Sequence, residues 1–231
     1  MSAPVPSGGV SPSRQSVPLA TCAGLRWVIR HRAFTPGYLV RYLRLLRLRC
    51  ARKPGLVIEG LVFLGRGVRI EVRPGYGRLI LGPWVHIGDH TALRVHEGSM
   101  TIGPKVVIGQ RVVLDCHLDI EIGEGTLIAD GVHVLDFDHR FDDPSRPIKD
   151  QGIVKSPVRI GPGCWLGGRA TVLRGSRIGT GSVIGAHAVV RGEIPAHAVA
   201  VGVPARVMRR VGPGDGGAIG PGDGAAGRAG A

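Results

Sequence analysis

The chain has 231 residues, of which 43% are hydrophobic and 4% aromatic, and its formal net charge at pH 7 is +13. A positive charge of this size can indicate nucleic-acid binding, but the basic residues are densest in residues 26–53 and no DNA- or RNA-binding motif accompanies them, so no nucleic-acid partner is predicted. No apolar run approaches the about 20 residues that a membrane-spanning helix needs.

The two ends of the chain have compositions that are typical of disordered segments. Residues 1–20 are rich in Ser, Pro and Gly, and residues 212–231 are almost entirely Gly, Ala, Pro and Asp, so we expect disorder in both. The four cysteines show no CxxC spacing and no secretory signal precedes them, which predicts reduced thiols and a cytoplasmic protein. They are Cys22, Cys50, Cys116 and Cys164.

Residues 21–55 form a basic segment for which we expect a helix. From position 36 the apolar side chains fall along one helical stripe, with arginines on the other sides. The stripe consists of Leu39, Tyr42, Leu43, Leu46 and Cys50. We favour a role for this helix as a cap that protects the strand edges at the end of a β-structure. Peripheral contact with an anionic membrane surface through residues 36–53 is compatible with that role.

Residues 56–211 carry an aliphatic residue at every sixth position, in triplets. The triplets are Ile58, Leu64, Ile70; Leu81, Ile87, Leu93; Ile102, Ile108, Leu114; Ile122, Ile128, Val134; Ile160, Leu166, Val172; and Ile178, Ile184, Val190. A short strand plus a corner fits this period, so that three sides close a triangular coil and stacked coils bury an apolar column. An antiparallel sandwich would instead show alternation and hairpin turns. With parallel strands about 4.8 Å apart, six coils make a prism roughly 29 Å tall.

The three members of a triplet are not equivalent. Glycine follows the first two members in most coils, and we expect it to permit a tight bend at the corner. Every spacing longer than six residues follows a third member. We therefore expect loops to leave the prism at this third corner, the longest of them being residues 135–159.

These units resemble the left-handed parallel β-helix of the hexapeptide-repeat acyltransferases. Two stretches carry a closer similarity to the maltose, galactoside and colanic-acid-type O-acetyltransferases: DFDHRFDDPSRPIKDQGIVKSPVRIGPGCWLGG and VIGAHAVVRGEIPAHAVAVGVPARV. The resemblance implies an all-β fold with a short N-terminal helical segment. It also implies acetyl-CoA as acyl donor, a saccharide or glycan-precursor hydroxyl as acceptor, and no metal. We expect a homotrimer, because three prisms side by side let the loop of one subunit meet the flank of the next.

The loop at residues 135–159 contains His139, to which the resemblance assigns the role of general base. A base that titrates near neutrality can take the proton of an acceptor hydroxyl as it attacks a thioester. Asp136 or Asp138 can orient the ring, although many enzymes of this family use a backbone carbonyl instead. Asp115 stands one coil earlier, where the resembling enzymes often place an asparagine that contacts the acceptor; it can equally be a solvated corner residue. We take all three aspartates as candidate substrate-binding residues.

The resemblance also implies a site for coenzyme A. Trp165 occupies the W-[IL]-G position of the family and is expected to line the pantetheine channel, with plain packing as the alternative. The phosphates of coenzyme A need cationic partners. The predicted cofactor-binding residues are Trp165, Gly167, Gly185, Arg191 and Arg206.

Three other functions fit parts of the sequence. An N-acetyltransferase acting on an amino or nucleotide sugar is the nearest alternative. The γ-class carbonic anhydrases share the prism and hold a metal through three histidines of adjacent subunits, but their close His-x4-His pair is absent here. The central histidines that raise this idea are His86, His90, His96, His117 and His133. A non-catalytic scaffold is disfavoured by the DH loop and the closing GVPARV motif.

Overall fold

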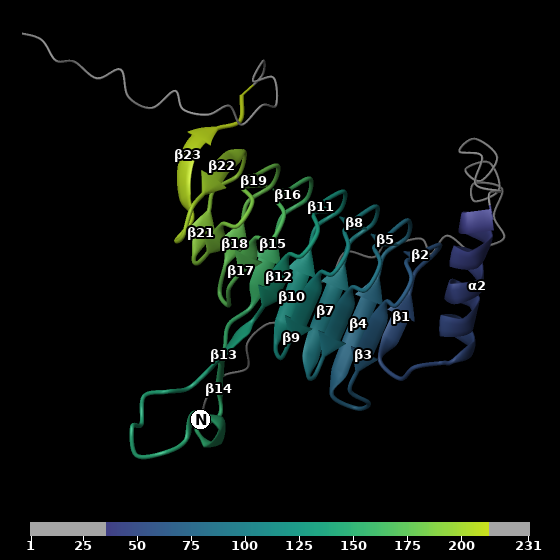
Figure 1. The fold of residues 1–231 in the computed structure, drawn as a ribbon, viewed down its shortest axis with the longest axis horizontal. Helices are drawn as coiled ribbons and strands as arrows, with labels where there is room; N and C mark the ends of the chain where they lie inside the picture. The colour runs from purple at the N-terminus through teal and green to yellow at the C-terminus, as the bar shows by residue number, and fades with distance from the viewer. Residues whose placement is uncertain (1–35, 213–231) are drawn as a thin grey trace, which may run out of the picture.

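Residues 56–210 wind around a prism with three faces, and each face is a stack of short parallel strands (Figure 1). This is the left-handed parallel β-helix that the sequence predicts. The computed structural model describes residues 36–212. Apart from residue 212, the disorder predicted for the two tails falls on residues outside this range, as does the part of the basic segment that precedes residue 36.

The three faces take one strand each from every coil. The first face contains β1 (Leu56–Ile58), β4 (Gly77–Leu81), β7 (Gly98–Ile102), β10 (Asp119–Ile122), β15 (Val158–Ile160), β18 (Arg177–Ile178) and β21 (Glu193–Ile194). The second face contains β2 (Phe63–Leu64), β5 (His86–Ile87), β8 (Val107–Ile108), β11 (Leu127–Ile128), β16 (Trp165–Leu166), β19 (Val183–Ile184), β22 (Ala198–Val201) and β23 (Arg206–Arg210). The third face contains β3 (Arg69–Val72), β6 (Ala92–Val95), β9 (Val113–Cys116), β12 (His133–Leu135), β17 (Thr171–Val172) and β20 (Val189–Val190).

The predicted register of the coils is confirmed. Every residue of the six triplets lies in a strand, and all of them except Ile58 in the outermost coil are buried. Strand pairing joins equivalent members of successive coils, as in Ile122 opposite Ile160 and Ile128 opposite Leu166. The inward aliphatic side chains therefore form one continuous apolar column, which is the source of the hydrophobic stabilisation of the fold.

The glycines after the inward residues have a different cause from the one we predicted. An added Cβ at Gly88 would lie 2.4 Å from the carbonyl carbon of Gly109, so glycine is needed to let successive coils approach at strand spacing. The bend itself falls three residues after the inward residue, where the backbone is left-handed. There φ is 66° at Trp84 and 59° at His90, and other coils place glycine at this position.

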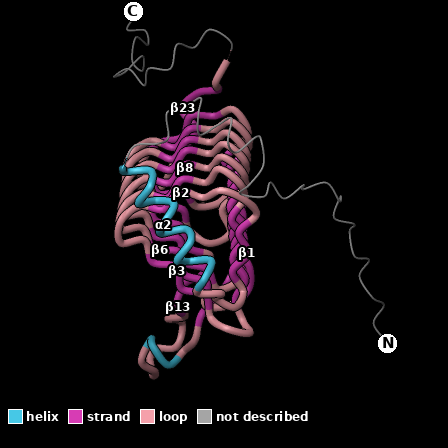
Figure 2. The backbone as a smooth tube through the Cα atoms, turned by 90° about the vertical axis from the view of Figure 1, so that its right-hand side faces the viewer, coloured by secondary structure: helices cyan, strands magenta, loops and turns pink. Residues whose placement is uncertain are grey.

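Helix α2 (Pro36–Cys50) lies across one open end of the prism (Figure 2). The rings of Tyr38 and Tyr42 pack against Phe63 at centroid distances of 5.8 and 6.2 Å. Leu45, on the same helix, is buried. Tyr42 therefore faces the prism and does not belong to the exposed part of the predicted stripe.

Three basic side chains of this region satisfy backbone carbonyls of the first coil. Arg44 Nη1 donates to the oxygen of Leu64 at 3.2 Å, and Arg49 Nη2 donates to that of Gly60 at 2.8 Å. Lys53 Nζ donates to the oxygen of Ile70 at 2.6 Å. These contacts are those expected of a cap, because they occupy strand-edge acceptors that no further coil could reach. Within residues 36–212, no helix is long and apolar enough to cross a membrane.

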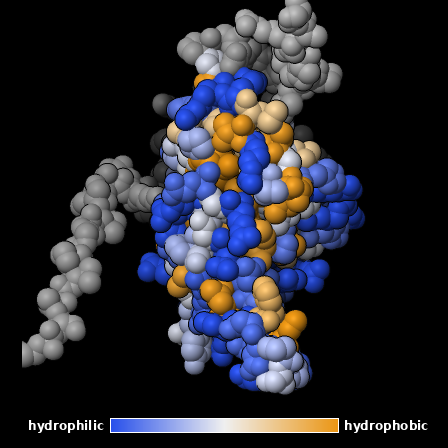
Figure 3. All heavy atoms as spheres, turned by 90° about the vertical axis from the view of Figure 1, so that its left-hand side faces the viewer, coloured by the Kyte–Doolittle hydropathy of each residue, from blue (hydrophilic) through white to orange (hydrophobic). Residues whose placement is uncertain are grey.

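The other end of the prism is closed by an antiparallel strand. β23 pairs with β22 and so covers the last strand of the second face. Figure 3 looks onto this end, where apolar and hydrophilic side chains are mixed on the surface. At this end, the last strand of the second face is thus covered by a segment that does not continue the repeat.

Candidate active site

The longest insertion in the prism leaves the third face after β12 and projects from its side (Figure 1). Within it, β13 (Phe137–His139) and β14 (Ile153–Lys155) pair in antiparallel fashion, and a 3-10 turn, η1 (Ile148–Asp150), lies near the tip. His139 lies at the end of β13 opposite Ile153, and its side chain is exposed. The hairpin thus carries the predicted base outside the apolar column, as we expected of this loop.

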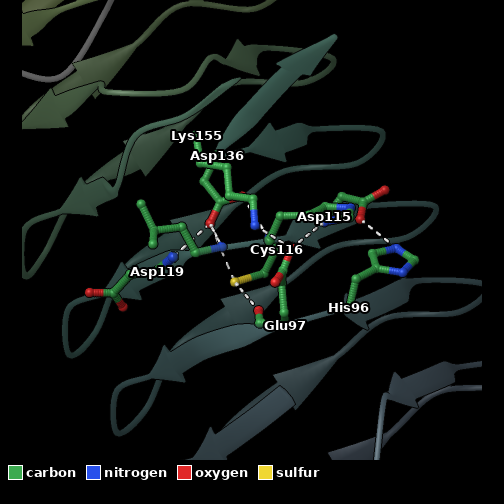
Figure 4. A network of polar contacts seen from close by, with 9 residues as sticks. His96, Glu97, Asp115, Cys116, Asp119, Asp136 and Lys155 are labelled. Carbon is green, nitrogen blue, oxygen red and sulfur yellow. Dashed lines mark hydrogen bonds and ion pairs between the residues drawn. The ribbon is translucent and has the colours of Figure 1, made fainter. Parts of the chain in front are cut away.

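Asp136, immediately before the hairpin, is fully buried against the corner of the preceding coil (Figure 4). Its Oδ1 accepts the backbone N–H of His117 at 2.8 Å. Its Oδ2 accepts those of Leu118 at 2.8 Å and Asp119 at 2.7 Å, and the Cys116 thiol lies 3.4 Å from the same oxygen. Asp136 therefore fixes this corner. Its carboxylate is buried and both oxygens accept backbone N–H groups, so we no longer propose it as a substrate ligand or as the group that orients His139.

Asp138 takes part in fastening the hairpin. Consecutive side chains of a strand point to opposite sides, so Asp138 is directed away from the side of Phe137 and His139. Its carboxylate instead pairs with Nε of Arg174. Within residues 36–212, the ring of His139 has no hydrogen-bond or ion-pair partner, so neither candidate carboxylate orients it.

A second ion pair fastens the other strand of the hairpin. Nζ of Lys155 on β14 pairs with Oε1 of Glu97, which lies between β6 and β7. Lys155, followed by His117, holds the pKa of the Glu97 carboxyl below its ordinary value. Glu97 is therefore an anion at neutral pH, and it ties the hairpin to a coil two levels below it.

Aromatic rings form a column from the corners of successive coils towards the hairpin. The His96 and His117 rings are stacked with centroids 4.5 Å apart, and the Phe137 ring lies 4.2 Å from His117. The His139 ring meets Phe137 edge-on at 6.2 Å. The strand register explains the column, because each ring follows the equivalent strand of the third face. The chain thus brings two further histidines beside the predicted base.

Asp115 lies next to this column and not in isolation at a solvated corner. Its Oδ1 lies 3.1 Å from Nε2 of His96, and its Oδ2 lies 3.5 Å from Nη1 of Arg94. Asp115 Oδ1 and His117 Nδ1 are buried, and neither has a hydrogen-bond partner with good geometry. The nearest charged or ionisable partner of Asp115 Oδ1 is His96 Nε2, and that of His117 Nδ1 is Oε1 of Glu97 at 3.5 Å. We call His96, Asp115 and His117 the corner cluster. The three side chains are partly exposed and carry donors and acceptors of the kind that bind hydroxyl groups.

The corner cluster is also the one group among the described residues whose atoms could hold a metal ion. One ligand atom from each residue lies within 4.8 Å of the others. However, the two imidazole planes are inclined by only 16°, and stacked rings do not direct their in-plane lone pairs to one point. The nearby guanidinium of Arg94 further disfavours a cation. The arrangement fits a hydrogen-bonding site better than a metal centre.

The predicted coenzyme A residues are divided between two faces of the prism. Trp165 is on the second face, with 40% of its surface exposed, between Leu127 and Val183 in the neighbouring strands. Arg191 follows β20 and is exposed. Arg206 is the first residue of β23, and its Nη1 donates to the backbone carbonyl of the preceding residue, Ala205. Within one subunit, Trp165 and Arg206 therefore belong to the second face, whereas Arg191 follows a strand of the same third face as the hairpin, two strands further along.

The two predicted cofactor-binding glycines have a packing role. An added Cβ at Gly167 would lie 2.6 Å from the nitrogen of Ala186, and one at Gly185 would lie 2.7 Å from Cγ1 of Val201. Both positions are thus governed by the approach of the next coil. A groove of about 690 Å³ along the edge between the first and second faces is lined by none of the predicted site residues.

Sequence reasoning missed the partners that build the site. No sequence motif marks Glu97, Lys155 or Arg174 as site residues. The sequence suggests His96 and His117 only as possible metal ligands, although their rings are stacked in the structure. One signal was available: the residues that follow each third-phase strand must stack at the same edge of the prism. Counting from those strands places His96, His117 and Phe137 in one line.

The chain is similar to known bacterial acetyltransferases. Residues 157–192 match the family model described as bacterial transferase hexapeptide (six repeats). A protein of Mycobacterium tuberculosis (strain ATCC 25618 / H37Rv) named as an acetyltransferase, Rv3034c, is 55% identical over 189 residues, which are 82% of this chain and 63% of that protein. The chain therefore spans less than two thirds of that relative.

A second relative is covered more fully. An Escherichia coli (strain K12) protein named as a lipopolysaccharide biosynthesis O-acetyl transferase, WbbJ, is 32% identical over 179 residues, which are 74% of this chain and 80% of that protein. Among solved structures, a mutant of the N-acyltransferase AntD from Bacillus cereus, in complex with dTDP and coenzyme A, matches with a TM-score of 0.62 at 21% identity. The match covers 73% of this chain and 89% of that one, and at this identity it shows a common fold.

Proposed function

Because the chain belongs to the hexapeptide-repeat transferases, we propose that it transfers an acetyl group from acetyl-CoA to a hydroxyl of a saccharide or glycan precursor. The observation that carries the proposal is the position of His139, which is exposed on a projecting hairpin, with the Phe137 ring between it and the corner cluster. The name of the E. coli relative supports transfer to oxygen.

The proposed reaction is a direct transfer with His139 as general base. The imidazole takes the proton of the acceptor hydroxyl while the oxygen attacks the thioester carbonyl carbon, and negative charge develops on the carbonyl oxygen. The tetrahedral intermediate then collapses, the carbon–sulfur bond breaks, and the imidazolium returns the proton to the leaving thiolate. The products are the acetyl ester and free coenzyme A, so no covalent enzyme intermediate is needed.

The corner cluster is the proposed acceptor site. The side chains of His96, Asp115 and His117 remain 44%, 14% and 20% exposed, and their polar atoms suit hydrogen bonds to sugar hydroxyls. Phe137 adds an apolar ring surface beside them. We retain Asp115 as a substrate-binding residue and assign Asp138 to the hairpin anchor.

The coenzyme A site is proposed to be completed by assembly. Trp165 and Arg206 lie on the second face, away from the face that the His139 hairpin leaves, so a neighbouring subunit in a homotrimer would have to supply them to the hairpin. Trp165 would contact the pantetheine arm, and Arg191 and Arg206 would neutralise phosphates. Sedimentation velocity tests the trimer, and a fully active monomer would contradict a site shared between subunits.

The test of the function is a thiol-release assay with acetyl-CoA over a panel of sugars, nucleotide sugars and amino sugars. His139→Ala should lower turnover by about 10²–10⁴-fold, the usual contribution of a positioned general base. Its melting temperature should stay near that of the wild type, because the side chain is exposed. Lys149→Ala, at the tip of the same loop, is the matched control and should keep full activity.

Two results would contradict the proposal. Wild-type turnover by a folded His139→Ala protein would place the base elsewhere. Amide products formed from amino sugars, with no ester formed from any hydroxyl acceptor, would assign the protein to N-acetyl transfer instead.

A further inference from the structure

Helix α2 has an outward face that is unusually apolar for a surface helix. Leu39, Leu43 and Leu46 are exposed by 59%, 51% and 57%, and Val40 lies beside them with a large exposed fraction. They follow the spacing of one helical stripe, whereas the adjoining side of the helix contacts the prism through Tyr38, Tyr42 and Leu45. The cap thus accounts for one side of α2 and leaves the other side unexplained.

The same region is strongly basic. Residues 36–53 contain six cations and no acidic residue. Arg44, Arg49 and Lys53 donate to neutral backbone carbonyls, and Arg47 is exposed. Within residues 36–212, none of the six forms an ion pair, so their positive charge is not neutralised inside the molecule.

We propose that the outward face of α2 docks on a membrane surface rich in anionic lipids. A helix with an apolar face and flanking cations lies in the interface plane, with its leucines at the headgroup boundary and its cations near lipid phosphates. A second copy of the helix is a poorer occupant, because it would bring six more cations against the first six. The occupant must supply both apolar depth and negative charge, and an anionic bilayer supplies both.

Docking in this way would leave the candidate active site free. α2 covers the first coil, whereas the hairpin leaves after β12 in the fourth coil (Figure 1). Three coil spacings separate these levels, which is about 14 Å. Attachment through α2 would therefore be independent of which acceptor the active site binds.

Co-sedimentation with lipid vesicles tests the proposal with the full chain. Binding should be strong to vesicles of phosphatidylcholine mixed with phosphatidylglycerol, weak to phosphatidylcholine alone, and reduced as salt is raised. The double substitution Leu43→Ser and Leu46→Ser should lower the partition coefficient at least about tenfold. Arg47→Gln should lower it severalfold and weaken its salt dependence.

The matched control places the same kind of change elsewhere. Phe141→Ser and Ile148→Ser remove two exposed apolar side chains from the projecting loop, and they should leave vesicle binding unchanged. Melting temperature and acetyl transfer to a water-soluble acceptor should be unaffected in the α2 variants. Loss of activity in them would thus be distinguishable from loss of attachment.

Three outcomes would overturn the proposal. Equal binding to neutral and anionic vesicles would show that anionic lipids are not required. Wild-type binding by the α2 double variant would show that another part of the chain attaches to the membrane. A change in oligomeric mass of the double variant, with unchanged vesicle binding, would show that a second copy of the chain covers this face.

Discussion

Replacement of Asp136 by alanine should destabilise the protein far more than replacement of Asp138, although the two carboxylates stand two residues apart. Asp136 accepts three backbone N–H groups and is buried, so its removal leaves three donors without their charged acceptor. Hydrogen bonds to charged groups contribute about 1.5–3 kcal/mol each. Water entering the vacated corner would recover part of this, and we expect a net loss of about 3–5 kcal/mol for Asp136→Ala.

The matched variant Asp138→Ala should cost less than about 1 kcal/mol, because its partner Arg174 and the carboxylate are both partly exposed. In a chain of this size, about 1 kcal/mol corresponds to a shift of about 2–4 °C in melting temperature. Asp136→Ala should therefore melt roughly 6–20 °C below the wild type, and Asp138→Ala within a few degrees of it.

The assay is thermal unfolding followed by circular dichroism, combined with hydrogen exchange of the amides of residues 117–119. Those amides should lose protection in Asp136→Ala and keep it in Asp138→Ala. If both variants melted together within about 2 °C of the wild type, the clamp would contribute little and the reasoning from buried donors would fail.

Three further predictions address the ligand sites and the pH response. Arg206→Ala should raise the KM for acetyl-CoA more than that for the acceptor, since the guanidinium is proposed to meet a phosphate; equal changes in both constants would count against that assignment. Incubation with a chelator, or with added zinc, should leave acetyl transfer unchanged because the rings of the corner cluster do not converge on one point, and a metal requirement measured in the thiol-release assay would revive the carbonic-anhydrase interpretation. Burial, with a smaller effect of Arg41, lowers the pKa of His86, so the unfolded chain takes up a proton near pH 6.5 that the folded protein resists. Stability should therefore be greatest above that pH and decline below it, and His86→Phe should flatten the decline in melting temperature between about pH 7 and pH 5; parallel slopes for the two proteins would show that other groups control it.

Most of the fold could be predicted from the sequence because its determinant is periodic. A single inward residue per side fixes the strand, its register and the face to which it belongs, and Ile122, Ile128 and Val134 illustrate this in one coil. The cause of the glycine pattern was mistaken, because the collision of a Cβ at Gly88 with the next coil depends on a neighbour 21 residues away. Local backbone preference does not contain that information.

The site was less predictable for the same physical reason. His139 could be found from the loop motif, but the partners of Asp136 and Asp138 depend on which corners stack beneath them. Sequence proximity suggested that both carboxylates serve His139. In the structure, Asp136 accepts hydrogen bonds from backbone N–H groups, and Asp138 forms an ion pair with Arg174.

The three edges of the prism differ in what they can accommodate. Where coils touch through glycine, an inserted residue would displace every strand above it. The edge from which the hairpin departs is different, because Val134 and Val158 each pair with strands of their own face whatever lies between them. The segment between Val134 and Val158 can therefore change in length or sequence without altering the pairing of these strands. A change in this segment would therefore alter the surface around His139 and leave the folding unit intact.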